Sequence, residues 1–245
     1  KSEESANELL KILRDSKSNT KKSLQILRKI KRFAYECPVL EISSVFEKLI
    51  TRLKDEDLYK LDDDLPLPSI FIHAEFIPKH KPKLLGEYPD IFQETFLLTK
   101  RFPHFEMVLN ICPEYFKQFR SCMNFLLYGD GPLSYDWRFY LGLVAACTYH
   151  NEYLINFTIL QYLLHGGDKL WIEEGYTALP DKLKAIMKLN CILAYTPWLI
   201  QKEHIQHLVA EGWSLQELSH AVIVMSIYHS LCGFVQGVGV AEEID

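Results

Sequence analysis

The stretch from Tyr135 to His165 limits most strongly what this chain can fold into. It contains no proline, and its one glycine is Gly142. The segment Asp130-Gly131-Pro132 predicts a turn before it, and Gly166-Gly167 predicts a stop after it. Because helices in globular proteins usually run about 8–20 residues, the stretch predicts two helices with a break near residues 148–151.

Asn151 is the expected first residue of the second of these helices. Asparagine is a favoured N-cap because its side-chain oxygen accepts a hydrogen bond from a free backbone N–H of the first turn. Ser134 can cap the first helix in the same way.

Apolar residues recur at helical spacing through most of the remaining chain, and few segments alternate as strands do. The predicted class is therefore all-α. Ser214 and Glu217 form a capping box that begins a long, strongly apolar helix, which Gly233, Gly237 and Gly239 end. The other expected helices lie in residues 5–58, with an interruption at Pro38 and a last segment Ser44–Leu58, and in Ile91–Lys100, Pro113–Leu127, Thr177–Ala194 and Ile200–Ala210.

A proline-rich segment separates two helical regions. Proline removes a backbone donor and restricts the preceding residue, so residues 61–90 are expected to form an extended connector. Phe71, Phe76 and Ile77 are expected to pin this connector to a surface. The predicted organisation is an N-terminal helical segment (1–60), the connector (61–90) and a main helical domain (91–241).

Composition excludes several classes of function. A net charge of -5 and a pI of about 6.0 do not favour nucleic acid or an anionic membrane as a partner. No stretch was expected to reach the roughly 20 apolar residues that span a membrane. The six cysteines are scattered, without a Cys-x-x-Cys pair, which favours a reducing compartment. The chain begins Lys1-Ser2 without Met, so the question of whether a targeting segment precedes it stays open.

Candidate ligands for a metal or cofactor are few. His204 and His207 are three residues apart and can share a helix face. Glu203, His207 and Glu211 also lie on one face, but surface charge pairing explains this triple equally well. Gly237-x-Gly239 closes a helix instead of opening one, so it does not predict a phosphate loop. No metal and no cofactor are predicted, and His220 and His229 are interpreted as core histidines.

The order of short motifs along residues 90–241 resembles the sestrin family. The resemblance implies an all-helical bundle like that of the AhpD alkylhydroperoxidases, with an additional N-terminal helical segment. Residues 1–85 carry the resemblance poorly. The motifs that carry it include Pro113-Glu114-Tyr115-Phe116, Asp130-Gly131-Pro132-Leu133, Trp137-Arg138, Tyr153-Leu154, Gly166-Gly167-Asp168, Pro197-Trp198-Leu199-Ile200, Lys202-Glu203-His204-Ile205, Trp213-Ser214-Leu215 and Tyr228-His229-Ser230-Leu231.

The resemblance also implies a cellular role. Sestrins are cytoplasmic and partly nuclear stress-responsive proteins, described as antioxidant, that restrain TOR growth-kinase signalling during amino-acid starvation. They act by binding a GATOR-type regulatory complex, and vertebrate members sense leucine. In the family, leucine binding and the principal regulatory contacts belong to a second helical half, and this chain ends at Asp245, before that half.

The family's peroxidase site is altered in this sequence. By resemblance, the redox cysteine falls on Asn151 and its histidine partner on Thr158, while the tyrosine is kept as Tyr153. A cysteine at a helix start is activated because the helix dipole stabilises its thiolate, and a nearby histidine shuttles the proton. An amide cannot reduce a peroxide, so the sequence predicts a catalytically silent peroxidase-like domain.

Two alternatives stay open. Cys147, with His150 nearby, could support weak alkylhydroperoxide reduction, although the C-terminal end of a helix raises a thiol pKa. Otherwise Cys147 is a buried core cysteine. A third interpretation is a helical module that only helps a further half of the protein to fold.

Overall fold

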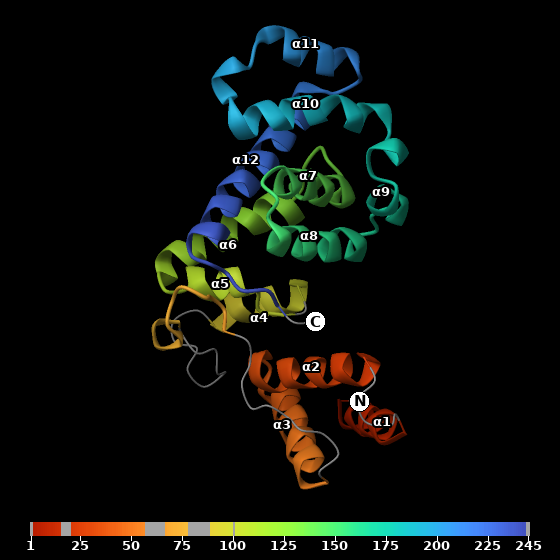
Figure 1. The fold of residues 1–245 in the computed structure, drawn as a ribbon, viewed down its shortest axis with the longest axis vertical. Coiled ribbons are helices and arrows are strands. Elements are labelled where there is room, and N and C mark those ends of the chain that lie inside the picture. The colour runs from red at the N-terminus through yellow and green to blue at the C-terminus, as the bar shows by residue number, and fades with distance from the viewer. Residues whose placement is uncertain (1, 16–20, 57–66, 78–88, 100, 244–245) are drawn as a thin grey trace. The chain divides into compact units, whose positions relative to one another are not determined.

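A computed structural model describes residues 2–15, 21–56, 67–77, 89–99 and 101–243 of the chain (Figure 1). These ranges form helices joined by short turns, and they contain no strand; their one isolated β-bridge joins Ser69 and Val240. The predicted all-α class is confirmed. The finer AhpD likeness and the predicted boundaries at 1–60, 61–90 and 91–241 stay predictions.

The chain divides into two compact units. Unit 1 comprises Lys1–Lys117 together with Val240–Asp245, and unit 2 comprises Gln118–Gly239. The elements are α1 (Ser2–Asp15), α2 (Lys21–Glu36), α3 (Leu40–Asp55), η1 (Ala74–Phe76), α4 (Pro89–Thr99), α5 (His104–Leu109), α6 (Pro113–Tyr128), α7 (Tyr135–Thr148), α8 (Glu152–Leu164), α9 (Lys169–Glu173), η3 (Gly175–Ala178), α10 (Asp181–Tyr195), η4 (Pro197–Leu199), α11 (Lys202–Ala210) and α12 (Leu215–Gly237).

The first three helices of unit 1 share a small apolar core. Leu13, Ile30 and Leu53 contribute from α1, α2 and α3 and are almost fully buried. The interruption at Pro38 is confirmed, but α3 begins at Leu40, earlier than the expected Ser44, and ends at Asp55.

The chain returns to unit 1 after α12. The Ala241 backbone N–H donates to the Pro68 carbonyl at 3.0 Å. Glu243 forms an ion pair of 2.6 Å with Arg101, and both side chains are more than nine-tenths buried. A Glu243 oxygen also accepts a 2.8 Å hydrogen bond from the His104 backbone N–H. Unit 1 is therefore built from segments far apart in sequence.

The core of unit 2 forms where α12 packs against α7 and α10 (Figure 1). Gly142 of α7 lies so close to the Tyr228 ring of α12 that an added Cβ would lie 2.5 Å from it. Gly142 thus permits the close approach of the two helices. Val224 and Met225 are fully buried in the same core.

The prediction that no stretch approaches membrane-spanning length was wrong for α12. By length and composition alone, Leu215–Gly237 is long and apolar enough to cross a membrane. The observation is weak evidence for a span, because half of the apolar window is buried inside the fold and a core helix passes the same test.

The break between α7 and α8 follows the sequence prediction. α7 ends at Thr148, His150 adopts a φ of 50°, and Asn151 is the N-cap of α8. α8 ends before Gly166, whose φ of 84° suits glycine, and the Gly167 N–H bonds back to the Tyr162 carbonyl at 2.9 Å. Ser134 occupies the N-cap position of α7, but its side chain makes no capping hydrogen bond.

Three other expectations need correction. Thr177–Ala178 belongs to the 3₁₀ turn η3, and the following helix begins at Asp181 with Pro180 as its N-cap. α5 was not expected. In the proline-rich segment Phe71 and Phe76 are exposed, and only Ile77 is buried. Residues 57–66 and 78–88 of the predicted connector lie outside the described residues.

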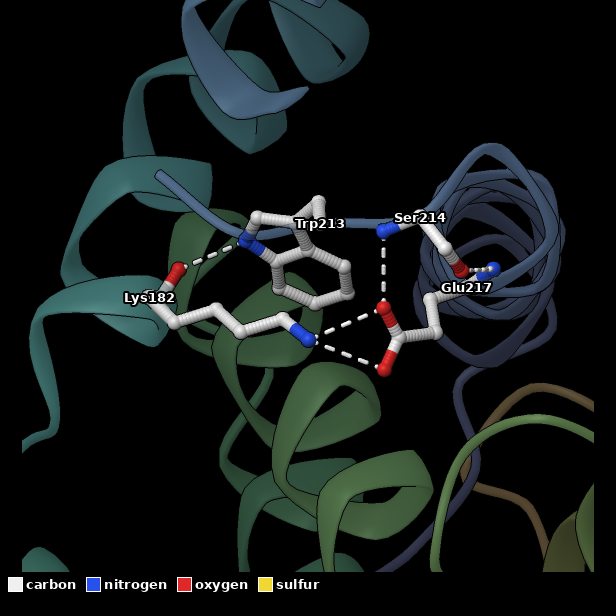
Figure 2. Close-up of polar contacts among 4 residues, drawn as sticks. All are labelled: Lys182, Trp213, Ser214 and Glu217. Carbon is white, nitrogen blue, oxygen red and sulfur yellow. Dashed lines mark hydrogen bonds and ion pairs between the residues drawn. The ribbon is translucent and has the colours of Figure 1, made fainter. Parts of the chain in front are cut away.

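A polar network joins the starts of α10 and α12 (Figure 2). The Lys182 ammonium donates to both Glu217 carboxylate oxygens at 2.9 Å, and it lies over the rings of Trp137 and Trp213. The Trp213 indole N–H donates to the Lys182 carbonyl at 2.7 Å. Ser214 and Glu217 complete the predicted capping box, so this prediction is confirmed.

Candidate functional site

The first turn of α8 places the candidate site inside unit 2. Asn151 is only 3% exposed, and Thr158 is fully buried seven residues later, about two helical turns along. Tyr153 is also buried, at 6% exposure. The three positions that match the family's peroxidase site therefore lie on the first two turns of one helix.

Both polar atoms of the Asn151 side-chain amide form hydrogen bonds that stabilise the fold. Its Oδ1 accepts a 3.0 Å hydrogen bond from the Leu154 backbone N–H, which caps α8. Its Nδ2 donates to the Cys232 carbonyl of α12 at 3.3 Å. Asn151, the residue that the resemblance assigns to the family's redox position, thus ties the start of α8 to α12, and its amide offers no group that can be oxidised by a peroxide.

Thr158 faces Tyr228 of α12. Burial raises the Tyr228 pKa well above its usual range, and the interaction of its hydroxyl with Thr158 offsets only part of this effect. Tyr228 therefore stays neutral near pH 7. A threonine hydroxyl beside a neutral phenol offers no proton acceptor for peroxide chemistry near neutral pH.

Cys147 is exposed at the end of α7 and lacks the usual means of thiol activation. The interpretation of Cys147 as a buried core cysteine was therefore wrong, but the part of its thiol that packs against the fold is desolvated, which raises its pKa. His150 interacts with it through the backbone, where the His150 N–H donates to the Cys147 carbonyl at 3.0 Å. No side-chain hydrogen bond joins this described pair, so the geometry supplies neither the base nor the helix N-terminus that lowers a thiol pKa.

Cys232 is a second thiol near this site, and the sequence interpretation missed its position. Burial raises the Cys232 pKa to about 12, with a smaller contribution from Cys147. Its side chain is fully buried. The only sequence signal was its place on the apolar helix α12, which does not reveal the contact with Asn151, 81 positions away.

The candidate histidines have structural roles. His204 Nδ1 accepts from the Gln201 N–H at 3.0 Å and so caps α11, and His207 Nδ1 lies 3.9 Å from a Glu211 oxygen. His229 forms a 2.9 Å hydrogen bond with Asn190, and His220 forms one of 3.0 Å with the Leu126 carbonyl. Among the residues that the structure describes, no group of three or more His, Cys, Asp or Glu side chains could hold a metal.

Comparison with known proteins identifies the class. Residues 67–245 match the family model for PA26 p53-induced protein (sestrin). Sestrin-1 of Mus musculus is 34% identical over 219 residues, covering 86% of this chain and 44% of the relative. Sestrin-2 of Homo sapiens is 35% identical over 181 residues, which cover 73% of this chain and 37% of the relative. The sestrin homolog of Drosophila melanogaster is 39% identical over 140 residues, which cover 56% of this chain and 28% of the relative.

The chain belongs to the sestrin family. It spans less than half the length of these relatives. The similarity also extends further toward the N-terminus than the expected range 90–241, because the family match begins at residue 67 and the Sestrin-1 alignment covers 86% of the chain.

Proposed function

We propose that this protein acts as a sestrin-like stress-responsive regulator that restrains TOR growth-kinase signalling through a GATOR-type complex. In this proposal its peroxidase-like domain recognises other proteins and does not turn over hydroperoxides. Family membership supports the regulatory part. The proposed cellular location is the cytoplasm and partly the nucleus, and any leucine site belongs to the half of the family's proteins that follows the matched region.

The hydrogen bonding of the Asn151 amide is the observation that supports the proposed lack of peroxidase activity. A redox residue must offer sulfur to the oxidant, and here a buried amide makes two structural hydrogen bonds instead. By resemblance, Thr158 stands where the family has the histidine that accepts and returns the proton. Loss of both partners removes the nucleophile and the base together.

The regulatory part is tested in cells from which the endogenous sestrins have been removed. The full reading frame that encodes this chain is supplied, and phosphorylation of TOR substrates is measured with and without amino acids. We expect phosphorylation to fall more completely during starvation than in empty-vector cells, and the GATOR-type complex to co-precipitate. The proposal fails if phosphorylation is unchanged and the complex is not recovered from cells that express the protein.

A matched variant separates regulation from thiol chemistry. Cys147→Ser removes the exposed thiol nearest Asn151 and leaves the α8 cap intact. We expect it to restrain TOR signalling as fully as the unchanged protein. A loss of restraint in this variant, with normal expression, would assign the function to a reactive thiol.

A further inference from the structure

A cavity of about 460 Å³ opens inside unit 2 on the side of α7 and α8 that meets α9 and α10. Each of these helices contributes to its wall: Cys147 from α7, Ile155 and Ile159 from α8, Trp171 from α9 and Met187 from α10. Its volume lies within the range of about 300–1,000 Å³ that is typical of small-molecule sites.

The cavity is separate from the altered peroxidase site. Asn151, Tyr153 and Thr158 do not line it. On α8, Ile155 and Ile159 line the cavity, whereas the neighbouring positions Asn151 and Thr158 lie toward α12 and are not part of the wall. A ligand in this cavity therefore would not use the positions that the family employs for peroxide reduction.

No side chain that is ordinarily charged near pH 7 lines the wall. None of its residues is Asp, Glu, Lys, Arg or His, and most are aliphatic or aromatic. The polar side chains of Thr148 and Asn190 satisfy each other, because the Asn190 Nδ2 donates to Thr148 Oγ1 at 2.7 Å. The Lys184 ammonium lies 5.9 Å from the centroid of the Tyr176 ring but does not line the wall, so an ion entering this space would lose hydration without gaining a counter-charge from the lining residues.

Tyr140 is a tyrosine on the wall that packs into the core of unit 2. Tyr140 is only 5% exposed, and within the described part of the chain its hydroxyl makes no hydrogen bond. Its ring packs against Tyr162 and Trp171, with centroid distances of 5.5 and 5.2 Å. Burial, with a contribution from the nearby Cys147, raises the Tyr140 pKa to about 12, so the hydroxyl keeps its proton near pH 7. A hydroxyl without a protein partner is available to hydrogen-bond a polar group of a ligand that enters the cavity.

We propose that this cavity binds an uncharged, largely apolar small molecule carrying one oxygen that hydrogen-bonds the Tyr140 hydroxyl. Transfer of apolar ligand surface from water to the aliphatic and aromatic wall drives binding. The lack of a charged partner selects against carboxylates and phosphates, and the Tyr140 hydroxyl sets the orientation. The inference does not depend on the proposed regulatory role.

The cysteines of the chain provide a built-in test. Cys147 and Cys191 are exposed and line the cavity, whereas Cys112 and Cys122 are exposed elsewhere and serve as internal controls. The 245-residue chain is treated with a small thiol reagent, and the labelling rate at each cysteine is followed by mass spectrometry. The probes are 2-naphthol, naphthalene and 2-naphthoate, which share one ring system and differ in the polar group.

We expect 2-naphthol to slow labelling of Cys147 and Cys191 at least threefold and to leave Cys112 and Cys122 unchanged. At the same concentration 2-naphthoate should protect neither pair. Equal slowing at all four cysteines, no slowing at any, or equal protection by 2-naphthoate would overturn the proposal.

Two variants test the contacts. Tyr140→Phe keeps the ring and removes the hydroxyl, so 2-naphthol should bind about 2–10-fold more weakly while naphthalene binds unchanged; equal weakening of both probes, or of neither, contradicts the assigned hydrogen bond. Cys191→Phe fills the cavity from an exposed position and should abolish protection of Cys147 by 2-naphthol. If Tyr140→Phe does not fold, Cys191→Phe decides alone, and undiminished protection in it overturns the proposal.

Discussion

At the scale of single residues, the amide side chain at position 151 has a structural role in unit 2. Asn151 caps α8 and donates to the Cys232 carbonyl, and both groups are buried. A buried side chain with two satisfied hydrogen bonds contributes to stability because water cannot replace its partners.

Asn151→Ala should therefore lower the free energy of unfolding of unit 2 by about 1–3 kcal/mol. Ser134→Ala is the matched control, because Ser134 holds the same N-cap position on α7 but is exposed and makes no side-chain cap bond. Urea denaturation followed by circular dichroism checks both. Equal destabilisation by the two substitutions would show that the Asn151 hydrogen bonds contribute nothing specific.

Asn151→Cys should create a thiol whose pKa is lower than that of Cys147. The introduced thiol would lie at the N-terminus of α8, where the helix dipole favours the thiolate, whereas Cys147 lies at the C-terminal end of α7. The pH dependence of thiol labelling at each site, read by mass spectrometry, measures the difference. A higher pKa at the introduced thiol would mean that burial at position 151 outweighs the dipole.

At the scale of elements, the contact of α7 with α12 depends on one glycine and the contact of α10 with α12 depends on one lysine. Gly142 leaves room for the Tyr228 ring. Lys182 joins Glu217 and the Trp213 ring (Figure 2), and it also lies over the Trp137 ring. The two contacts are steric and electrostatic, so they respond to different substitutions.

Gly142→Ala should destabilise unit 2 by about 1–3 kcal/mol, because the new methyl group overlaps the Tyr228 ring. Gly233→Ala in α12 is the control, since no atom lies within 4 Å of its added Cβ and alanine favours helix; this change should stabilise by about 0.5–1 kcal/mol. The two substitutions should thus shift the thermal midpoint in opposite directions. A stabilising Gly142→Ala would mean that the helices separate without cost.

The Lys182–Glu217 pair should make the stability of unit 2 depend on pH. Burial tends to raise the Glu217 pKa, but hydrogen bonds from Lys182 and Ser214 outweigh it, so the pKa is lowered in the folded state. The stabilisation is therefore present above the unfolded-state value near 4 and is lost as pH falls through the folded-state value. Lys182→Met should lower the free energy of unfolding at pH 7 by about 1–2 kcal/mol. The free energy of unfolding should also decrease less in this variant when the pH is lowered from 5 to 3.

Lys169→Met is the control for that substitution, because the Lys169–Glu173 pair lies exposed on α9. It should leave the stability and its pH dependence close to those of the unchanged chain. An identical pH profile in Lys182→Met and the unchanged chain would contradict the assigned role of Glu217.

At the scale of the whole molecule, residues 240–243 belong to unit 1 although they follow α12 of unit 2. The nearly buried ion pair of Glu243 with Arg101 holds this return segment beside α5. Breaking one partner of a buried pair leaves an uncompensated charge, which is more costly than removing both.

Glu243→Gln should therefore speed amide hydrogen exchange in α5 by at least tenfold, while amides of α7 and α8 stay unchanged. Glu242→Gln is the control, because Glu242 is the exposed neighbour of Glu243. Equal exchange in α5 for both variants would show that the ion pair does not anchor the return segment.

Local sequence patterns predicted the helix breaks and caps that depend on neighbouring residues. They did not predict features that depend on burial or on contacts between residues far apart in the sequence. The α7–α8 break, the Asn151 cap and the Ser214–Glu217 box were predictable because each depends on residues a few positions apart. α5 was not, since all six of its residues are buried and show no alternation of polar and apolar faces. The hydrogen bond from Asn151 to the Cys232 carbonyl joins positions 81 residues apart, which no local spacing reveals.

The most direct test of the central claim is the rate at which the purified chain reduces cumene hydroperoxide with a thiol reductant. We expect no turnover above that of the reductant alone, and measurable turnover after Asn151→Cys is combined with Thr158→His in a folded protein. Turnover by the unchanged chain that disappears in Cys147→Ser would contradict the account, because it would place a working redox thiol beside the position that Asn151 occupies.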